Sequence, residues 1–404
     1  MKSTQTLTID RLGHRGEGVA ILEGKPVFVA LTLQGETVIA EIEGDRGQLV
    51  DVVNPSAFRR RPFCPHYGAC GGCQLQHLKP DGYHQFKRNR VVEALSRADI
   101  VAEVNDAVSA HGIGRRRATL HATQSAAGFM ALRSRNVHDL DACPILVPDL
   151  AHATDIARAI AAAVGPCDVS FTASDMGLDV AVRAKGVKPG ARLVAVAQHF
   201  DLARLSLNGE ALILLRPPMA TIGRSSVPLP VSSFLQATSQ AEKTLAKLVA
   251  DAVKGARNVA DLFCGVGPFA LRLAARAPVF AADSDGPAIS ALNAAKRTTK
   301  GLKPIIAERR DLFREPLGAF ELNRFDAVVL NPPRAGARAQ AEELAKSNVA
   351  TIAYVSCDPQ SFARDAGVLI AGGYAIGPVT PVDQFAYSAH VEVFAIFRKT
   401  AAKR

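Results

Sequence analysis

Two reactive side chains near the end of the chain could carry out covalent chemistry. Cys357 follows the short β-branched and aromatic run Tyr354-Val-Ser356 and precedes an Asp-Pro pair. Since proline cannot continue strand pairing, this pattern predicts a buried strand that ends at a thiol. Glu392 follows in a later Ala-His-Val-Glu segment. A thiol and a carboxylate can act as nucleophile and general base on one substrate.

A glycine turn indicates where a cofactor would bind. Residues 258–264 read as a strand, and Gly265-Val-Gly-Pro268 turns into the next helix. Asp283 comes about twenty residues later, after a second strand, where an acid can accept hydrogen bonds from a ribose. Asp311 follows a third strand, where such sheets place a group near an adenine. The turn lacks the lysine of a phosphate loop, so we expect no nucleoside triphosphate, and NAD stays open as an alternative.

The chain has seven cysteines, and three of them lie within ten residues of one another: Cys64, Cys70 and Cys73. In a reducing cytosol such clustering points to metal binding or catalysis and not to disulfides. Three thiolates need a fourth ligand; Cys143 is the best candidate, with His66 and His77 as nearby alternatives. Spacing alone favours zinc over an iron–sulfur cluster. We interpret Cys167 and Cys264 as packing residues.

The composition fits a soluble nucleic-acid-binding protein. The 404 residues are enough for two or three domains, and 48% of them are hydrophobic. The net charge of +10 favours an anionic partner, with nucleic acid first. No apolar run is long enough to span a membrane and the first residues lack an apolar signal core. We therefore expect a cytoplasmic protein without membrane contact, and a monomer.

The pattern of short strands and helices divides the chain into three regions. Residues 1–58 hold short strands separated by glycine and charged turns, which predicts a small β-barrel. Residues 59–230 mix strands and helices, and a polar helix within 74–105 could pack on the last domain. Residues 231–404 alternate strand and helix, which predicts a mostly parallel sheet. We expect the central arginine clusters to face RNA phosphates: Arg59–Arg61, Arg115–Arg117, Arg133 and Arg135.

Taken in order, these features resemble those of bacterial RNA uridine-C5 methyltransferases. The segment Leu12-Gly-His-Arg-Gly-Glu-Gly-Val-Ala20 resembles the TRAM domain appended to RNA-modifying enzymes. Cys70-Gly-Gly-Cys-Gln-Leu-Gln-His77 resembles the family's [4Fe–4S] site. Asp261-Leu-Phe-Cys-Gly-Val-Gly267 resembles class I S-adenosylmethionine-dependent methyltransferases. The residues around Cys357 and the terminal His-Val-Glu392 resemble the motifs of the family's nucleophile and base.

The resemblance implies an α/β class I (Rossmann-like) methyltransferase domain, preceded by an OB-like barrel and a central α+β domain that holds the cluster. It implies S-adenosylmethionine (SAM) and a [4Fe–4S] cluster as cofactors, and RNA as partner. A barrel together with the cluster favours 23S rRNA, with tRNA second. Cys357 would bond to carbon 6 of a uracil, and Glu392 would remove the hydrogen on carbon 5. The implied cofactor-binding residues are Gln236, Phe263, Gly265, Gly267, Pro268, Asp283, Asp311 and Asn331. The implied cluster ligands are Cys64, Cys70, Cys73 and Cys143.

Four residues depart from the family pattern. Pro268 replaces a frequent Asn, Asp283 a Glu, Asn331 an Asp, and Asp358 an Asn. Asn-Pro-Pro followed by an aromatic would indicate methylation of an exocyclic amine. Arg334 occupies that fourth place and argues against this alternative, as does the presence of both reactive side chains.

Overall fold

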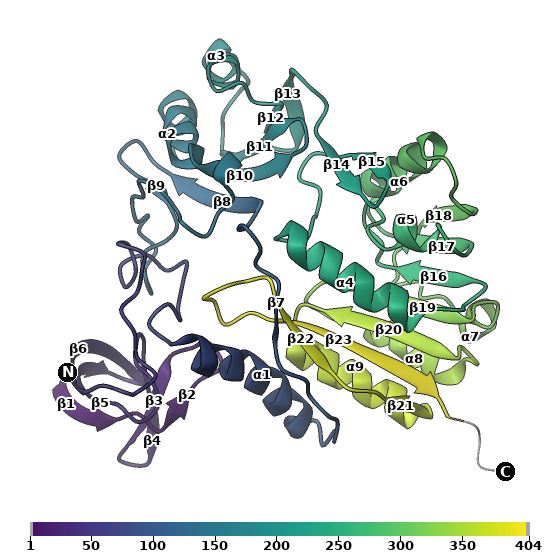
Figure 1. Ribbon diagram of the computed structural model, residues 1–404. Helices are drawn as coiled ribbons and strands as arrows, with labels where there is room; N and C mark the ends of the chain where they lie inside the picture. Colours follow the sequence, from purple (N-terminus) through teal and green to yellow (C-terminus); the bar gives the residue numbers. More distant parts are fainter. Residues whose placement is uncertain (1–2, 401–404) are drawn as a thin grey trace.

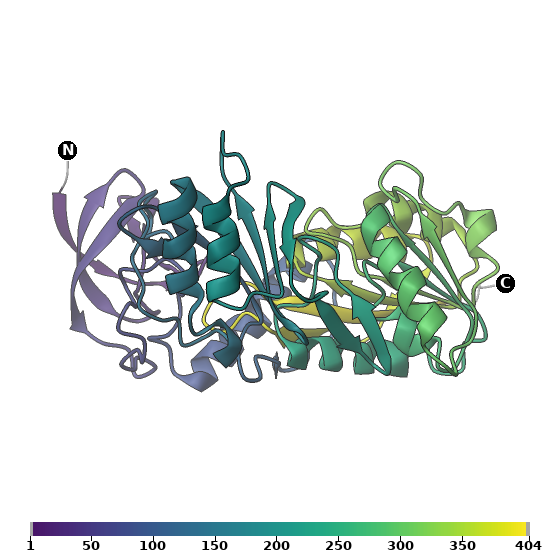
Figure 2. The same ribbon diagram turned by 90° about the horizontal axis from the view of Figure 1, so that it is seen from above.

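The chain folds into three large sheets and one small hairpin, with helices on the last two sheets (Figure 1). The structure is a computed structural model that describes residues 3–400. Seen from above, the N-terminal sheet and the C-terminal sheet lie at opposite ends of an elongated molecule (Figure 2). None of the helices in this described part is both long and apolar enough to cross a membrane.

The N-terminal sheet curls around a small core of its own. Its strands are β1 (Ser3–Thr8), β2 (Arg11–Leu12), β3 (Gly18–Leu22), β4 (Lys25–Val29), β5 (Thr37–Glu43) and β6 (Arg46–Asn54). β1 pairs with β5 and β2 pairs with β3, and these two pairs form the two ends of the strand order. Because β1 and β2 nearly follow on from one another, one segment links both edges. The TRAM assignment stays a prediction.

The central sheet is covered by helices on one face. Its order is β13-β12-β11-β10-β8-β9. The strands are β8 (Arg117–Ala122), β9 (Ala127–Gly128), β10 (Cys167–Ser174), β11 (Gly177–Arg183), β12 (Arg204–Leu207) and β13 (Glu210–Leu214). Helix α2 (Ala153–Val164) follows a short 3-10 turn, Pro148–Leu150, and packs with α3 (Ala191–His199) over the sheet. Cys167 is buried in this core, as expected for a packing residue.

The C-terminal sheet is mostly parallel, as its alternating pattern predicts. Its order is β18-β17-β16-β19-β20-β23-β22-β7, with β21 beside β23. The strands are β7 (Val108–Ser109), β16 (Val259–Leu262), β17 (Val279–Asp283), β18 (Ile305–Arg309), β19 (Ala327–Leu330), β20 (Thr351–Ser356), β21 (Tyr374–Ile376), β22 (Thr380–Asp383) and β23 (Glu392–Lys399). β16 to β20 pair in parallel, and β23 inserts antiparallel between β20 and β22.

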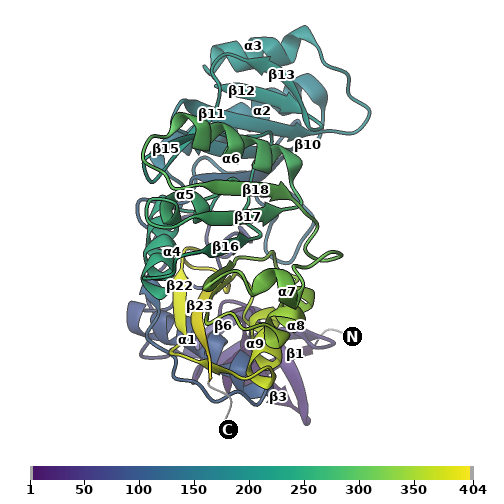
Figure 3. The ribbon, with the colours of Figure 1, turned by 90° about the vertical axis from the view of Figure 1, so that its right-hand side faces the viewer.

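Helices cover both faces of this sheet, so that its strands are buried on both sides (Figure 3). One face carries α4 (Ser239–Ala252), α5 (Ala270–Leu273) and α6 (Gly286–Thr298); the other carries α7 (Ala319–Leu322), α8 (Arg338–Lys346) and α9 (Pro359–Ala371). Three of these helices begin at a side-chain cap. Thr238 accepts from Ala241 N, Asp285 from Ala288 N, and Asp358 from two amides of α9.

Segments from before residue 231 complete the core of the last sheet. Helix α1 (Pro80–Arg97) packs against α9, and its Val91 and Leu95 belong to the same buried cluster as β19 and β20. β7 extends the edge of the sheet. The hairpin of β14 (Met219–Ile222) and β15 (Ser225–Pro228) lies against α6. The C-terminal core is therefore assembled from three separated stretches of sequence.

Candidate active site

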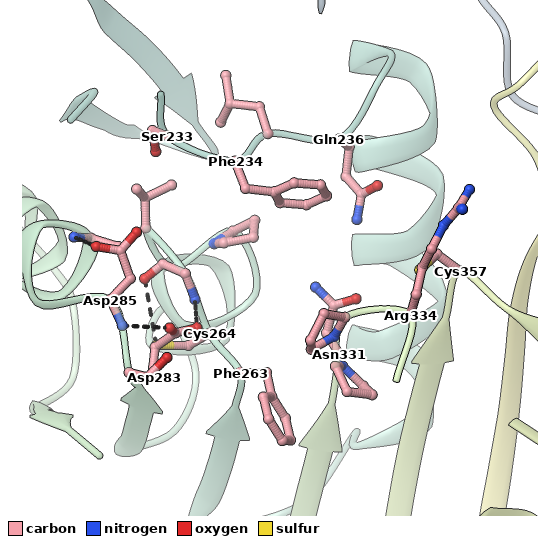
Figure 4. Close-up of a pocket in the computed structure, with 18 of the residues that line it drawn as sticks. Ser233, Phe234, Gln236, Phe263, Cys264, Asp283, Asp285, Asn331, Arg334 and Cys357 are labelled. Carbon is pink, nitrogen blue, oxygen red and sulfur yellow. Dashed lines mark hydrogen bonds between the residues drawn. The ribbon is translucent and has the colours of Figure 1, made fainter. Parts of the chain in front are cut away.

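A cavity of about 450 Å³ lies at the carboxyl ends of the central strands of the last sheet (Figure 4). From β16 the chain moves outward to β17 and β18, and then returns to β19 on the other side of β16. Ligands of open α/β sheets bind at such a reversal of strand order. The predicted residues that line the cavity are Gln236, Phe263, Gly265, Pro268, Asp283, Asn331, Cys357 and Glu392.

Two predicted cofactor residues lie outside the lining of this cavity. Gly267 has a φ of +87°, and a Cβ there would come within 2.5 Å of the Leu292 side chain. It is therefore required for the turn and for helix packing. The carboxylate of Asp311 accepts the backbone N–H of Phe313 at 3.1 Å. Phe313, which the sequence analysis did not single out, lines the cavity instead.

Asp283 organises the turn at the cofactor end of the cavity. Its Oδ2 accepts the N–H of Gly265 at 2.9 Å and its Oδ1 accepts the N–H of Asp285 at 2.9 Å. Each carboxylate oxygen keeps a second lone pair that can accept from a hydroxyl. Phe263 at the end of β16 has a φ of +62°, an uncommon conformation for a bulky residue that recurs at functional sites. Asp285 also lines the cavity and was missed because its capping motif carries no functional signal.

Strand register brings Cys357 and Glu392 together. In the antiparallel pair of β20 and β23, Ser356 lies opposite Val393. One step further in the same register, Cys357 lies opposite Glu392, so the two are cross-strand neighbours at the sheet edge. Asp358 accepts the N–H groups of Gln360 and Ser361 and caps α9. Aspartate and asparagine are equally good caps, so this departure from the family preserves the turn after the thiol.

Burial favours the neutral form of both reactive groups. Burial raises the pKa of the Cys357 thiol to about 11, helped by the negative charge of Glu392 and opposed by Arg334. Burial also raises the pKa of Glu392 to about 7, opposed by a hydrogen bond from Gln384 and by Arg334. At neutral pH the resting site therefore holds a thiol beside a carboxyl group that is about half ionised. The positive charge of Arg334 favours the thiolate of Cys357 and the carboxylate of Glu392.

Gln384 connects the carboxylate of Glu392 to the other side of the cavity. Its Oε1 accepts the backbone N–H of Ala237 at 2.8 Å. Since a backbone N–H can only donate, the other end of this amide must be the NH2 group. That NH2 donates to Glu392 Oε1 and to Gln236 Oε1, both at 2.7 Å. The sequence analysis missed Gln384, because a glutamine eight residues before Glu392 has no distinctive pattern.

Helix α1 fixes the loop that joins β22 to β23. The Lys87 ammonium is fully buried and lies 2.8 Å from Asp383 Oδ1. It also donates to the carbonyls of Phe385 and His390. The Tyr83 hydroxyl donates to Asp383 Oδ2 and accepts the N–H of Tyr387. Gln384 and Glu392 therefore lie at the two ends of a loop that a helix from the first quarter of the sequence holds in place.

The four predicted cluster ligands line one cavity of about 260 Å³. Burial raises the pKa of the Cys143 thiol to about 12, and the other three cysteines add to this shift. Of the histidine alternatives, His66 lines the same cavity, whereas the His77 ring bonds with the Tyr67 hydroxyl. Within residues 3–400, no three such side chains converge closely enough to hold a single metal ion. A metal site is thus not shown.

Several arginines that were expected to face phosphates have partners inside the protein. Arg116 pairs with Glu242 at 2.5 Å and donates to the Gln236 carbonyl. Arg117 donates to the carbonyl of Leu235. The guanidinium groups of Arg59, Arg60 and Arg133 also donate to internal acceptors. These contacts join segments of the fold. Each guanidinium has five N–H donors and Arg133 is exposed, so the expectation that these arginines face phosphates stays a prediction.

Known proteins similar to this chain are RNA methyltransferases. A family model described as tRNA (Uracil-5-)-methyltransferase matches residues 228–400. An uncharacterized RNA methyltransferase of Rhizobium meliloti is 43% identical, over 98% of this chain and 100% of the relative. The 23S rRNA (uracil(1939)-C(5))-methyltransferase RlmD of Chromohalobacter salexigens is 33% identical, over 96% of this chain and 87% of the relative.

A solved structure shares the fold over nearly the whole length. It is the Pyrococcus abyssi tRNA (uracil-54, C5)-methyltransferase in complex with S-adenosyl-L-homocysteine, with a TM-score of 0.76 and 24% identity, over 97% of this chain and 99% of that chain. The C-terminal domain therefore has the class I methyltransferase fold. The chain belongs to the RNA uracil methyltransferase family, and it is a SAM-dependent enzyme that acts on RNA.

Proposed function

We propose that the protein methylates carbon 5 of a uridine in RNA through a covalent bond between Cys357 and carbon 6. The observation that carries this proposal is the cross-strand placement of Cys357 and Glu392 at the edge of one cavity. Carbon 5 of uracil is a poor nucleophile until a thiolate adds to carbon 6 and turns the ring into an enolate. Methylation of an exocyclic amine would need neither a thiol nor a base beside the ring.

Each residue has a role in a balanced sequence of steps. The Cys357 thiol gives its proton to solvent water, which the positive charge of Arg334 favours, and the thiolate bonds to carbon 6. SAM, when bound, supplies an electrophilic methyl group to carbon 5. Ionised Glu392 then takes the hydrogen from carbon 5 as a proton. The electron pair left behind restores the carbon 5–carbon 6 double bond and expels the Cys357 thiolate.

The cofactor side of the cavity fits SAM. Asp283 holds the glycine turn and keeps lone pairs for ribose hydroxyls. Gln236 and Asn331 line the space between that end and Cys357. Asn331 replaces the family's aspartate and offers both a donor and an acceptor to a uracil edge.

We favour 23S rRNA as the target. The relative named as a 23S rRNA enzyme is 33% identical, whereas the protein named as a tRNA enzyme is 24% identical. Mapping of methylated nucleosides in rRNA and tRNA from cells that lack the gene tests this choice. Loss of one 5-methyluridine in 23S rRNA, restored by the wild type and not by Cys357→Ala, is the expected result. Loss of an N-methylated nucleoside would instead support the amine alternative.

We further propose that Cys64, Cys70, Cys73 and Cys143 hold a [4Fe–4S] cluster. Four thiols around one cavity match cysteine-only ligation, and a cluster holds its thiolates farther apart than a single ion does. Protein purified without oxygen should contain about four irons and absorb visible light. Cys143→Ala should abolish both signals. Stoichiometric zinc without iron would show that the site is a zinc site.

A further inference from the structure

A second, larger cavity lies beside the active site. It has a volume of about 1130 Å³ and is lined by the turn after β2, by α1, by the central domain and by the loops around Cys357. Arg334 lines both this groove and the catalytic cavity, and Asp358 and His390 lie on its wall. The groove therefore adjoins the catalytic cavity, with Arg334 on the wall of both.

Arg90 of α1 reaches this groove without a partner. Its Nε and Nη1 atoms are buried and have no hydrogen-bond partner within residues 3–400. Other cations of the same helix are engaged: Lys87 with Asp383, and Arg88 with the carbonyl of Val104. The carboxylates of Glu93 and Asp358 lie close enough to raise the Arg90 pKa, but neither makes a hydrogen bond to it in the described residues. Glu93 pairs with Arg97, and Asp358 Oδ1 accepts the two amides that begin α9.

Burying the Nε and Nη1 atoms without an acceptor is costly, because these N–H groups give up hydration and gain no hydrogen bond. Burial lowers the pKa of Arg90, which expresses this cost. A ligand that brought an anion into the groove would give these N–H groups an acceptor and so remove this cost. The surroundings favour an anion: Arg15 lines the same groove, and burial together with Arg90 and Arg15 lowers the pKa of His14.

We propose that Arg90 binds a phosphodiester group of the RNA strand that enters the catalytic cavity, at a linkage adjoining the target nucleotide. A phosphodiester offers two anionic oxygens, and a guanidinium can donate to both in one plane. Arg15, from the N-terminal sheet, would contact the same stretch of backbone. The contact would set the position of the nucleotide relative to Cys357. This inference requires that RNA is the substrate, but it does not require that carbon 5 is the atom that is methylated.

The test measures RNA binding in the Cys357→Ala background, so that no reaction occurs. The RNA is a fragment around whichever nucleotide the methylation map identifies, so a failure of the carbon 5 mechanism leaves this test intact. In one set of fragments, each linkage near that nucleotide is replaced in turn by an uncharged methylphosphonate. Replacement of one particular linkage should weaken RNA binding about tenfold, as expected for loss of a charge-assisted contact.

Arg90→Gln should weaken binding of the natural RNA by a similar factor and should be insensitive to methylphosphonate at that linkage. The slope of log affinity against log salt should fall by about 0.7, the value for one phosphate contact on a single strand. Lys247→Gln is the control, because Lys247 is an exposed helix cation in an i,i+4 pair with Asp251 and lines neither cavity. It should change neither measurement.

Arg90→Lys keeps the charge and should retain the salt slope, and SAM affinity and melting temperature check the folding of each variant. Arg90→Gln with wild-type RNA affinity would overturn the proposal. The proposal would also be overturned if Arg90→Gln bound RNA more weakly but each methylphosphonate reduced its affinity by the same factor as in the protein that retains Arg90. The latter result would mean that Arg90 acts by holding the capped start of α9.

Discussion

Replacing Gln384 by leucine should move the pH dependence of catalysis to higher pH. In the wild type, the Gln384 NH2 donates to Glu392 at 2.7 Å and favours the carboxylate, whose pKa is about 7. A hydrogen bond to a charged group contributes about 1.5–3 kcal/mol, and one pKa unit corresponds to about 1.4 kcal/mol. Loss of this donor should therefore raise the pKa of Glu392 by about 1–2 units.

The sign of the effect follows from the role of Glu392 as a base. Only the ionised carboxylate can accept the proton, so the rate rises as pH passes upward through the pKa of Glu392. At pH 7 the ionised fraction should fall about 5- to 50-fold in the variant, and near pH 9 it should return to within about twofold of the wild type. Hydration or strain at the new leucine would lower the rate at every pH alike.

The assay is release of tritium from RNA labelled at carbon 5 of uridine, measured in single turnovers between pH 5.5 and 9. Gln340→Leu is the matched control, because Gln340 is a fully buried glutamine whose amide bonds only with the backbone of Leu317. It should lower stability and leave the pH profile unchanged. If the rate of Gln384→Leu rises with pH over the same range as the rate of the wild type, the reasoning is refuted.

Three further changes probe the same site. Glu392→Gln should still form the bond to Cys357 and accept the methyl group, but it should accumulate a methyl-labelled protein–RNA adduct on a denaturing gel; normal turnover would identify another base. Arg334→Gln should raise the pKa of both groups and slow adduct formation at neutral pH, with recovery at higher pH; an unchanged pH profile would remove Arg334 from the electrostatics. Lys87→Met should destabilise the fold by about 3–5 kcal/mol in thermal or denaturant unfolding, because it leaves the buried carboxylate of Asp383 without its ion pair. A loss below about 1 kcal/mol would show that this ion pair is not required.

Some features of this protein could be predicted from sequence because local physics specifies them. The thiol after β20 was recognisable from a buried β-branched run stopped by Asp-Pro, and the turn after β16 from its glycines. Strand and helix alternation was enough to predict the parallel sheet. Such signals depend on neighbours in sequence, so one sequence read alone contains them.

Other features were decided by the tertiary structure alone. Gln384 became part of the site because two strand registers place it between Glu392 and Gln236, which lie far apart along the chain. The internal acceptors of Arg116 and Arg117 arrive from distant segments, so no local pattern could reveal these contacts. The sequence left two interpretations equally open for the basic residues of the helix that carries Arg90: contact with RNA, or an ordinary solvated face. Whether a charge is paired depends on what the fold packs against it, and that is a property of three-dimensional contacts which residue types and spacing do not encode.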